Sequence, residues 1–169
     1  ATRHLTTEQK TDFDDAAREF VTRQMAIADR AAGHMGLGLF YSDLGETEKA
    51  IEAYRDGKRI EPEFLPSRIN LAELLYQQNR PREAEKEFRD AVEAAAMPEN
   101  EGQARDALAR FLIRMKRYDE GIEELGKAVE LMPRHAQTLY FYGVALNSTN
   151  RFAEALPFLE RSIELAPNN

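Results

Sequence analysis

The chain has 169 residues, of which 43% are apolar and 31% are charged, and its formal net charge is −7. This balance predicts a soluble, folded protein rather than a disordered one, and no apolar run approaches the roughly 20 residues that a membrane-spanning helix needs. Acidic residues outnumber basic ones along the whole sequence, which argues against nucleic-acid binding, and the absence of cysteine excludes disulfides, thiol nucleophiles and thiolate metal sites.

The first thirty residues predict a single helix. Phe13 and Phe20 fall on one face, and Thr6 or Thr7 stands before the apolar pattern as an N-cap. We expect this helix to run from about 7 to 28. Because no packed first helix precedes it, its expected role is to cover the neighbouring segment, as terminal helices of repeat proteins do.

From residue 31 onward, eight helices are expected to alternate with short turns. Pro66, Pro81 and Pro157 are expected at or near helix starts, where the missing N–H costs little. The stretch MPENEG, residues 97–102, is expected to form a longer surface loop. The predicted helices are 32–44, 48–60, 66–78, 82–96, 101–115, 119–131, 136–148 and 152–165.

Similar residue types return at fixed intervals along these helices. Steps of 34, 37 and 34 residues lead back from Pro167 to Pro133, Ala96 and Pro62. The same steps connect two columns of small residues and one column of large apolar residues: Gly143, Ala109, Ala72 and Gly38; Ala155, Gly121, Ala84 and Ala50; and Leu159, Leu125, Phe88 and Tyr54. A register shared by several columns indicates an internal repeat.

The pattern resembles the tetratricopeptide repeat (TPR) family, whose unit is a helix–turn–helix of 34 residues. Residues 136–169 form the clearest copy, although the family's tryptophan is replaced in the four copies by His34, Arg68, Arg105 and Leu139. The resemblance implies an all-α fold, a right-handed α-solenoid with an N-terminal capping helix. The implied segments are the cap, 1–30, and four repeats, 31–64, 65–101, 102–135 and 136–169.

The glycine cluster in AAGHMGLGLF raises the question of a phosphate-binding loop. Neither the G-x-G-x-x-G order after a strand nor the G-K-[ST] ending of a P-loop is present. Gly38 belongs to a column of small residues where two helices press together, so we interpret it as a packing residue. Gly36 is an additional glycine within a helix, and the sequence gives no reason for it beyond close approach of a ligand or neighbouring helix.

In the TPR family, one face of each first helix lines a concave groove that holds peptides or helices of partner proteins. The resemblance places Asp106 and Ala107 on that arc. It also places there the thirteen residues that we predict as the binding groove: Met35, Leu39, Ile69, Asn70, Glu73, Tyr76, Gln77, Arg110, Ile113, Arg114, Tyr140, Val144 and Asn147.

Two arginines in this set suggest a ligand chemistry. Arg110 and Arg114 are four residues apart and share a helix face, so together they could bind one carboxylate, or they could instead pair with Asp106 and Glu73. Some family members grip chaperone C-termini with a carboxylate clamp. Only Asn70 matches that clamp here, so this ligand is not expected.

The sequence does not predict an enzyme, a cofactor or a metal site. His4, His34 and His135 are widely separated in the repeat register, and a metal site needs several converging ligands. Adjacent carboxylates such as Asp14 and Asp15 point in different directions on a helix, which fits solvent exposure better than acid–base chemistry.

We therefore expect a non-catalytic scaffold that binds a peptide or helix of another protein. Two alternatives stay open. Residues 28–64 are similar to TPR tails joined to multihaem cytochromes, which would make the chain an accessory domain of a larger enzyme or periplasmic electron-transfer protein. Phe158 stands where other copies are small or charged, and it predicts an apolar C-terminal patch that supports a homodimer. The compartment, cytoplasmic or periplasmic, stays open.

Overall fold

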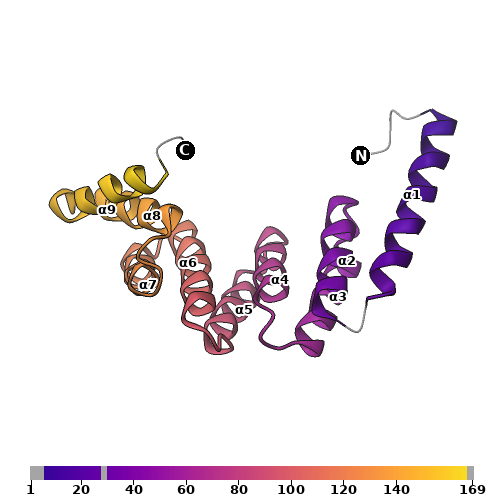
Figure 1. Ribbon diagram of the computed structural model, residues 1–169, viewed down its shortest axis with the longest axis horizontal. Helices are drawn as coiled ribbons and strands as arrows, with labels where there is room; N and C mark the ends of the chain where they lie inside the picture. Colours follow the sequence, from indigo (N-terminus) through magenta and orange to yellow (C-terminus); the bar gives the residue numbers. More distant parts are fainter. Residues whose placement is uncertain (1–5, 28–29, 167–169) are drawn as a thin grey trace. The chain divides into compact units, whose positions relative to one another are not determined.

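The computed structural model describes residues 6–27 and 30–166, which form α-helices joined by turns (Figure 1). The chain divides into two compact units, Ala1–Ala84 and Glu85–Asn169, which are considered separately. The predicted helix ends agree with the structure to within three residues. The helices are α1 Thr7–Met25, α2 Ala31–Asp43, α3 Thr47–Ile60, α4 Leu65–Gln77, α5 Pro81–Glu93, α6 Pro98–Arg114, α7 Tyr118–Leu131, α8 Ala136–Ser148 and α9 Phe152–Leu165.

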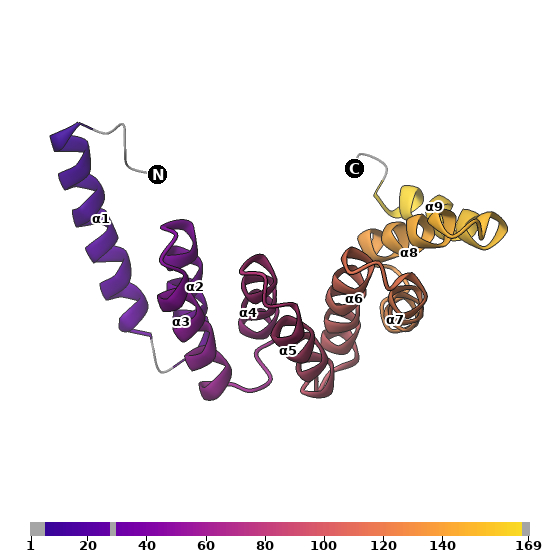
Figure 2. The same cartoon turned by 180° about the vertical axis from the view of Figure 1, so that it is seen from behind.

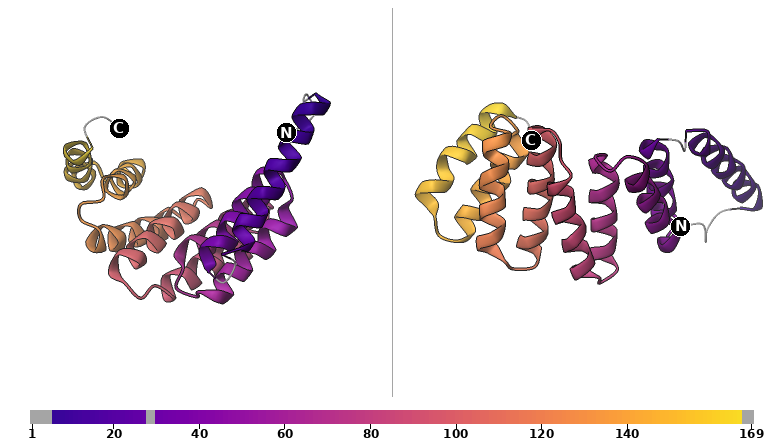
Figure 3. Two further views of the ribbon diagram at one scale, coloured as in Figure 1. Left: turned by 45° about the vertical axis from the view of Figure 1, so that its right-hand side comes forward. Right: turned by 90° about the horizontal axis from the view of Figure 1, so that it is seen from below.

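Helix α1 begins with a capping box and packs against α2 (Figure 3). The Thr6 hydroxyl accepts a hydrogen bond from the Gln9 backbone N–H, and the Gln9 side chain accepts one from the Thr6 N–H. The rings of Phe20 and Phe40 lie 5.0 Å apart between the two helices. The predicted N-cap is therefore confirmed at Thr6, and α1 covers the first helix of the repeat region. His4 lies outside the described residues.

The glycines of α2 serve packing, as predicted. A methyl group on Gly38 would overlap the Tyr54 ring of α3, and one on Gly33 would lie 2.7 Å from the Ile27 carbonyl oxygen. The unexplained Gly36 faces the Gln24 side chain of α1, whose Oε1 would lie 2.6 Å from an added methyl. The close approach at Gly36 is thus made by a neighbouring helix.

The second unit contains the packed helix pairs α6–α7 and α8–α9 (Figure 2), and glycine packing returns in the latter pair. A methyl on Gly143 would lie 2.6 Å from Leu159, just as one on Gly38 would meet Tyr54. The Phe88 and Phe111 rings lie 5.2 Å apart. A further buried cluster joins α6 to α9 through Ala109, Ile122, Leu125, Ala145, Leu146 and Ala155.

The turns within the helix pairs share one backbone conformation. Gly45, Asn79, Lys116 and Asn150 have positive φ values, between 58° and 78°, and are separated by the same steps of 34, 37 and 34 residues. One residue further on, a backbone N–H returns to a carbonyl five residues earlier, as from Arg117 to Leu112 at 2.9 Å. This closes the helix ends in the manner of a Schellman motif and reproduces the repeat register independently of the side chains.

Two expectations about local structure are wrong. Residues 98–102 are not part of a surface loop but the first turn of α6, which has 17 residues where α2, α4 and α8 have 13 each. Pro98 at the first position and Glu99 in the first turn favour a helix N-terminus. Pro157 is not at a helix start but inside α9, where it lacks the donor for the Ala153 carbonyl.

Candidate functional site

In the first unit, seven of the predicted groove residues lie on the neighbouring helices α2 and α4, and all seven are half-buried or exposed. Leu39 is 45% exposed. Residues beside them on the same helices, such as Leu37 and Leu71, are buried. The helices therefore present one face to their neighbours and leave the predicted face accessible. The seven residues are Met35, Leu39, Ile69, Asn70, Glu73, Tyr76 and Gln77.

In the second unit, the remaining six residues lie on α6 and α8: Arg110, Ile113, Arg114, Tyr140, Val144 and Asn147. Tyr140 is 50% exposed and Val144 41%. Ile113 is half-buried and packs against the core cluster and Gly121, so it contributes to packing as well as to the surface. We call these predicted residues, seven on the first unit and six on the second, the first-helix surface of each unit.

Asp106 and Ala107, which the resemblance places on the same arc, do not belong to this surface. Both are buried, and the Thr138 hydroxyl of α8 donates a hydrogen bond of 3.0 Å to Asp106 Oδ1. Arg110 Nε lies 3.0 Å from Asp106 Oδ2. Since Thr138 gives its one proton to Asp106, its 2.8 Å contact to His135 Nδ1 requires that nitrogen to carry a hydrogen. Of the two possibilities left open for Arg110, the structure shows the ion pair with Asp106.

The Arg110 guanidinium also packs on an aromatic ring. Its carbon lies 5.4 Å from the centre of the Phe141 ring, and the Phe141 and Tyr140 rings lie 5.8 Å apart. The ion pair to Asp106 and the ring contact hold the guanidinium on the first-helix surface, with 43% of the Arg110 side chain exposed.

A largely apolar hollow of about 620 Å³ opens between α8 and α9. Tyr140, Phe141, Leu159 and Ile163 are among its lining residues. It was not predicted, although its signal is in the sequence: Phe152, Leu156, Leu159 and Ile163 are spaced by four, three and four residues, so they form one apolar stripe along α9.

The apolar patch expected around Phe158 has a different centre. Phe158 is half-buried and packs edge-on against Tyr142, with ring centres 4.7 Å apart. The large exposed apolar side chains of α9 are Phe152, Leu156 and Ile163, which are 57%, 56% and 66% exposed. The expected apolar patch is therefore formed mainly by neighbours of Phe158, because Tyr142 of α8 covers part of the Phe158 ring.

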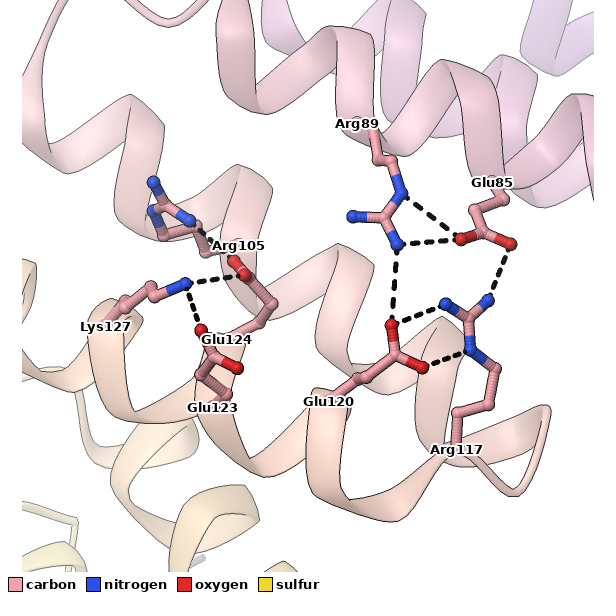
Figure 4. A network of polar contacts seen from close by, with 8 residues as sticks. All are labelled: Glu85, Arg89, Arg105, Arg117, Glu120, Glu123, Glu124 and Lys127. Carbon is pink, nitrogen blue, oxygen red and sulfur yellow. Dashed lines mark hydrogen bonds and ion pairs between the residues drawn. The ribbon is translucent and has the colours of Figure 1, made fainter.

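Polar networks hold the helices of the second unit together (Figure 4). Glu85 accepts hydrogen bonds from Arg89 on its own helix and from Arg117 at 2.7 Å, and Arg117 also binds Glu120. Burial disfavours the charged form of the Glu85 carboxylate, but the hydrogen bonds from the two arginines outweigh it and lower its pKa.

The second network occupies a position where the TPR family has tryptophan. Arg105 of α6 reaches Glu124 of α7 at 2.6 Å and Glu101 at 2.8 Å (Figure 4). Burial again works against ionisation of Glu124, yet hydrogen bonds from Lys127 and Arg105 lower the pKa of its carboxyl group. An ion pair between helices thus takes the place of aromatic packing in this repeat.

The two described histidines have separate partners, each within its own unit. His34 lies 3.9 Å from Asp56, and His135 contacts Thr138 in the other unit. Within residues 6–27 and 30–166, no group of three or more histidine and carboxylate side chains is arranged to hold a metal ion. No helix in this described part combines the length and apolar character needed to cross a bilayer.

Family models described as tetratricopeptide repeat match residues 31–64, 69–129 and 101–168. The type IV pilus assembly protein PilF of Pseudomonas aeruginosa is 26% identical over 137 residues, which cover 80% of this chain and 53% of PilF. Its solved structure has a TM-score of 0.69 at 25% identity, covering 82% of this chain and 62% of that one.

Human protein O-mannosyl-transferase TMTC3 is 26% identical over 178 residues, covering 96% of this chain and 19% of TMTC3. This chain therefore spans about a fifth of TMTC3 and about half of PilF. The structure of YrrB, described as a TPR protein with an unusual peptide-binding site, has a TM-score of 0.62 at 21% identity and covers 96% of this chain and 82% of that one. The matched repeats and the shared all-α fold show that the chain belongs to the tetratricopeptide repeat family.

Proposed function

We propose that this chain is a non-catalytic scaffold that binds a peptide or helix of another protein on its first-helix surface. The proposal rests on the exposure of large apolar and aromatic side chains on this surface. Leu39, Tyr140 and Val144 are each at least 41% exposed, although neighbouring positions on the same helices are buried. Exposed aromatic and aliphatic side chains among polar ones are typical of protein-binding surfaces.

The comparisons support a binding role without naming a partner. YrrB is described as having a peptide-binding site, and PilF is named for pilus assembly. TMTC3 is named as a transferase, but this chain spans only 19% of it. The ligand is therefore proposed by chemistry alone, as a segment that offers apolar side chains to Tyr140 and Val144.

The test uses a random peptide display library as the probe. Peptides selected on the wild-type chain are titrated into ¹⁵N-labelled protein, and amide shifts are followed by NMR. The proposal expects the largest shifts on α2, α4, α6 and α8. Shifts concentrated on the outward faces of α3, α5 and α7 would contradict it, as would a library that gives no binder.

An accessory role in a longer protein is a second candidate, favoured by the partial coverage of TMTC3 and PilF. C-x-x-C-H haem motifs elsewhere in a full-length protein would favour this role in electron transfer. Their absence from such a protein would remove the haem version.

Self-association is a third candidate, and the exposed stripe of α9 favours it. Light scattering of the wild type and Leu156→Glu tests it. A dimer that becomes a monomer on substitution supports self-association through α9. Monomers for both proteins over a wide concentration range exclude it.

A further inference from the structure

Phe141 joins a cationic group to the apolar hollow of the second unit. The Arg110 guanidinium lies over the Phe141 ring, at 5.4 Å from its centre, and Phe141 also lines the hollow between α8 and α9. An extended chain advances roughly 3.3–3.6 Å per residue. A bound segment could therefore place a carboxylate at Arg110 and an apolar side chain in the hollow about one or two residues apart.

The hollow corresponds to a packing surface that is filled in the preceding repeat. Leu125, Ala128 and Met132, 34 residues before three of its lining residues, are buried, and α7 packs against α8. Of their counterparts, Leu159 and Ala166 are half-buried and Ser162 is buried, while Ile163, which lines the same hollow, is 66% exposed. The corresponding surface between α8 and α9 is left more open, and its apolar lining favours burial of another apolar side chain.

The guanidinium retains capacity for a ligand. Arg110 Nε binds Asp106, but guanidinium has five N–H donors and 43% of the side chain is exposed. Arg114 follows one helical turn later on the same face. The hydrogen bond from Thr138 fixes Asp106, so the ion pair positions Arg110 at the surface.

We infer that this site takes a partner segment in which an acidic residue stands within two positions of a bulky apolar residue. The carboxylate binds Arg110, with Arg114 as a second cationic group, and the apolar side chain enters the hollow beside Leu159 and Ile163. This specificity rests on the proposed binding function and adds a defined ligand chemistry to it.

Charge complementarity favours such a segment over a second copy of this chain. The exposed stripe of α9 is formed by Phe152, Leu156 and Ile163, and Glu160 stands beside it, four residues after Leu156 and three before Ile163. Glu154 and Glu164 of this described helix are paired with Arg151 and Arg161 at 2.7 and 2.8 Å. A second copy docking through the stripe would offer Arg110 the carboxylate of Glu160, which is three or four residues from Ile163 and Leu156 rather than one or two, and the test below separates the two occupants.

The test uses fluorescein-labelled ten-residue peptides on a Gly-Ser background. Each carries one Leu, Phe or Trp and one Glu at a separation of one to five positions, and a matched set carries Gln in place of Glu. Fluorescence anisotropy with the whole chain should show Glu peptides at separations of one or two binding about tenfold more tightly than their Gln partners. The preference should fade at a separation of five.

Variants assign the two parts of the site. Arg110→Gln should remove the preference for Glu. Because this change also removes the ion-pair partner of the buried Asp106, the double variant Asp106→Asn/Arg110→Gln repeats the measurement without a buried carboxylate that lacks this partner. Ile163→Ser, at an exposed position, should weaken Glu and Gln peptides equally. Arg134→Gln, an exposed arginine in the turn before α8, is the matched control and should leave the preference unchanged.

Equal binding of Glu and Gln peptides, or no binding by either set, would overturn the inference. So would an unchanged Glu preference in both Arg110 variants, or a dimer at assay concentration that loses its association in Leu156→Glu. Peptides selected from the random library could still bind the first-helix surface in each of these cases, so failure here is distinguishable from failure of the proposed function.

Discussion

Gly38 lies so close to the Tyr54 ring that a single added methyl group would overlap it. The same relation returns in the last repeat, where a methyl on Gly143 would lie 2.6 Å from Leu159. Each glycine belongs to a column of small residues on a first helix, and each large partner belongs to the matching column on the second helix. The large residue therefore occupies the space that a side chain on the glycine would need.

Gly38→Ala should destabilise the protein by about 1–3 kcal/mol, because the buried Tyr54 ring has no room to move. Gly36→Ala is the matched control. The three atoms nearest to its added methyl belong to the Gln24 side chain, which can move away, and the variant gains up to about 1 kcal/mol of helix propensity. Thermal melts should rank Gly36→Ala at or above the wild type and Gly38→Ala below it. The reverse order would mean that the helix register is wrong.

Tyr54 should make stability fall at high pH. Burial, aided by the charge of Asp43, raises its pKa from 10.0 to about 12. A group with a raised pKa in the folded state stabilises fully below its unfolded pKa, and that contribution is lost as the pH rises from 10 to 12. Urea unfolding at pH 9 and 12 should show a smaller loss in Tyr54→Phe than in the wild type. Equal losses would contradict the assignment.

The repeat architecture was predictable because it depends on spacing. Columns of small residues, prolines at helix ends and turn residues such as Asn79 occur at intervals that the sequence displays directly. The status of residues 98–102 was less visible. The segment reads as polar, yet Pro98 and Glu99 suit a helix N-terminus, and the helical outcome depends on packing, as where Met132 faces Gly102.

Thr138→Val should destabilise the protein by about 1–3 kcal/mol, because it removes the hydroxyl that donates to the buried Asp106 carboxylate. The two side chains have similar shapes, so packing changes little. Thr138→Ser retains the hydroxyl and should cost less. Chemical denaturation of the three proteins at pH 7 makes the comparison, and a Thr138→Val variant as stable as the wild type would show that the hydrogen bond contributes nothing.

Glu124→Gln should reduce stability at pH 7 and not at low pH. Lys127 and Arg105 overcome the effect of burial and lower the Glu124 pKa from 4.5. A carboxyl group with a lowered folded pKa stabilises above its unfolded value, and the contribution disappears as the pH falls below 4.5 towards the folded value.

The expected difference from the wild type is about 1–2 kcal/mol at pH 7 and shrinks below pH 4.5. Denaturant titrations at several pH values measure it. Glu160→Gln, an exposed change on α9, is the control and should alter stability little at any of them. A Glu124→Gln deficit that persists undiminished in acid would contradict the role of the ion pair.

The binding surface was less predictable than the fold. Helix periodicity indicates which face of α8 carries Tyr140, but not that Asp106 is buried and bonded to Thr138 of α8, or that Arg110 packs on Phe141. Those contacts join residues about 30 positions apart, and their geometry depends on how closely two first helices approach. Phe158 illustrates the same limit, since its partner Tyr142 decides how much of the ring is exposed.

Calorimetry with a display-selected peptide tests most directly the claim that this chain binds proteins through its first-helix surface. Arg114→Glu and Tyr140→Ala should each weaken binding by about 1–3 kcal/mol, while the exposed control changes Arg134→Glu and Tyr118→Ala should alter it little. Circular dichroism should show unchanged helicity in all four variants. Equal affinity of the wild type, Arg114→Glu and Tyr140→Ala, with the helices intact, would contradict the account.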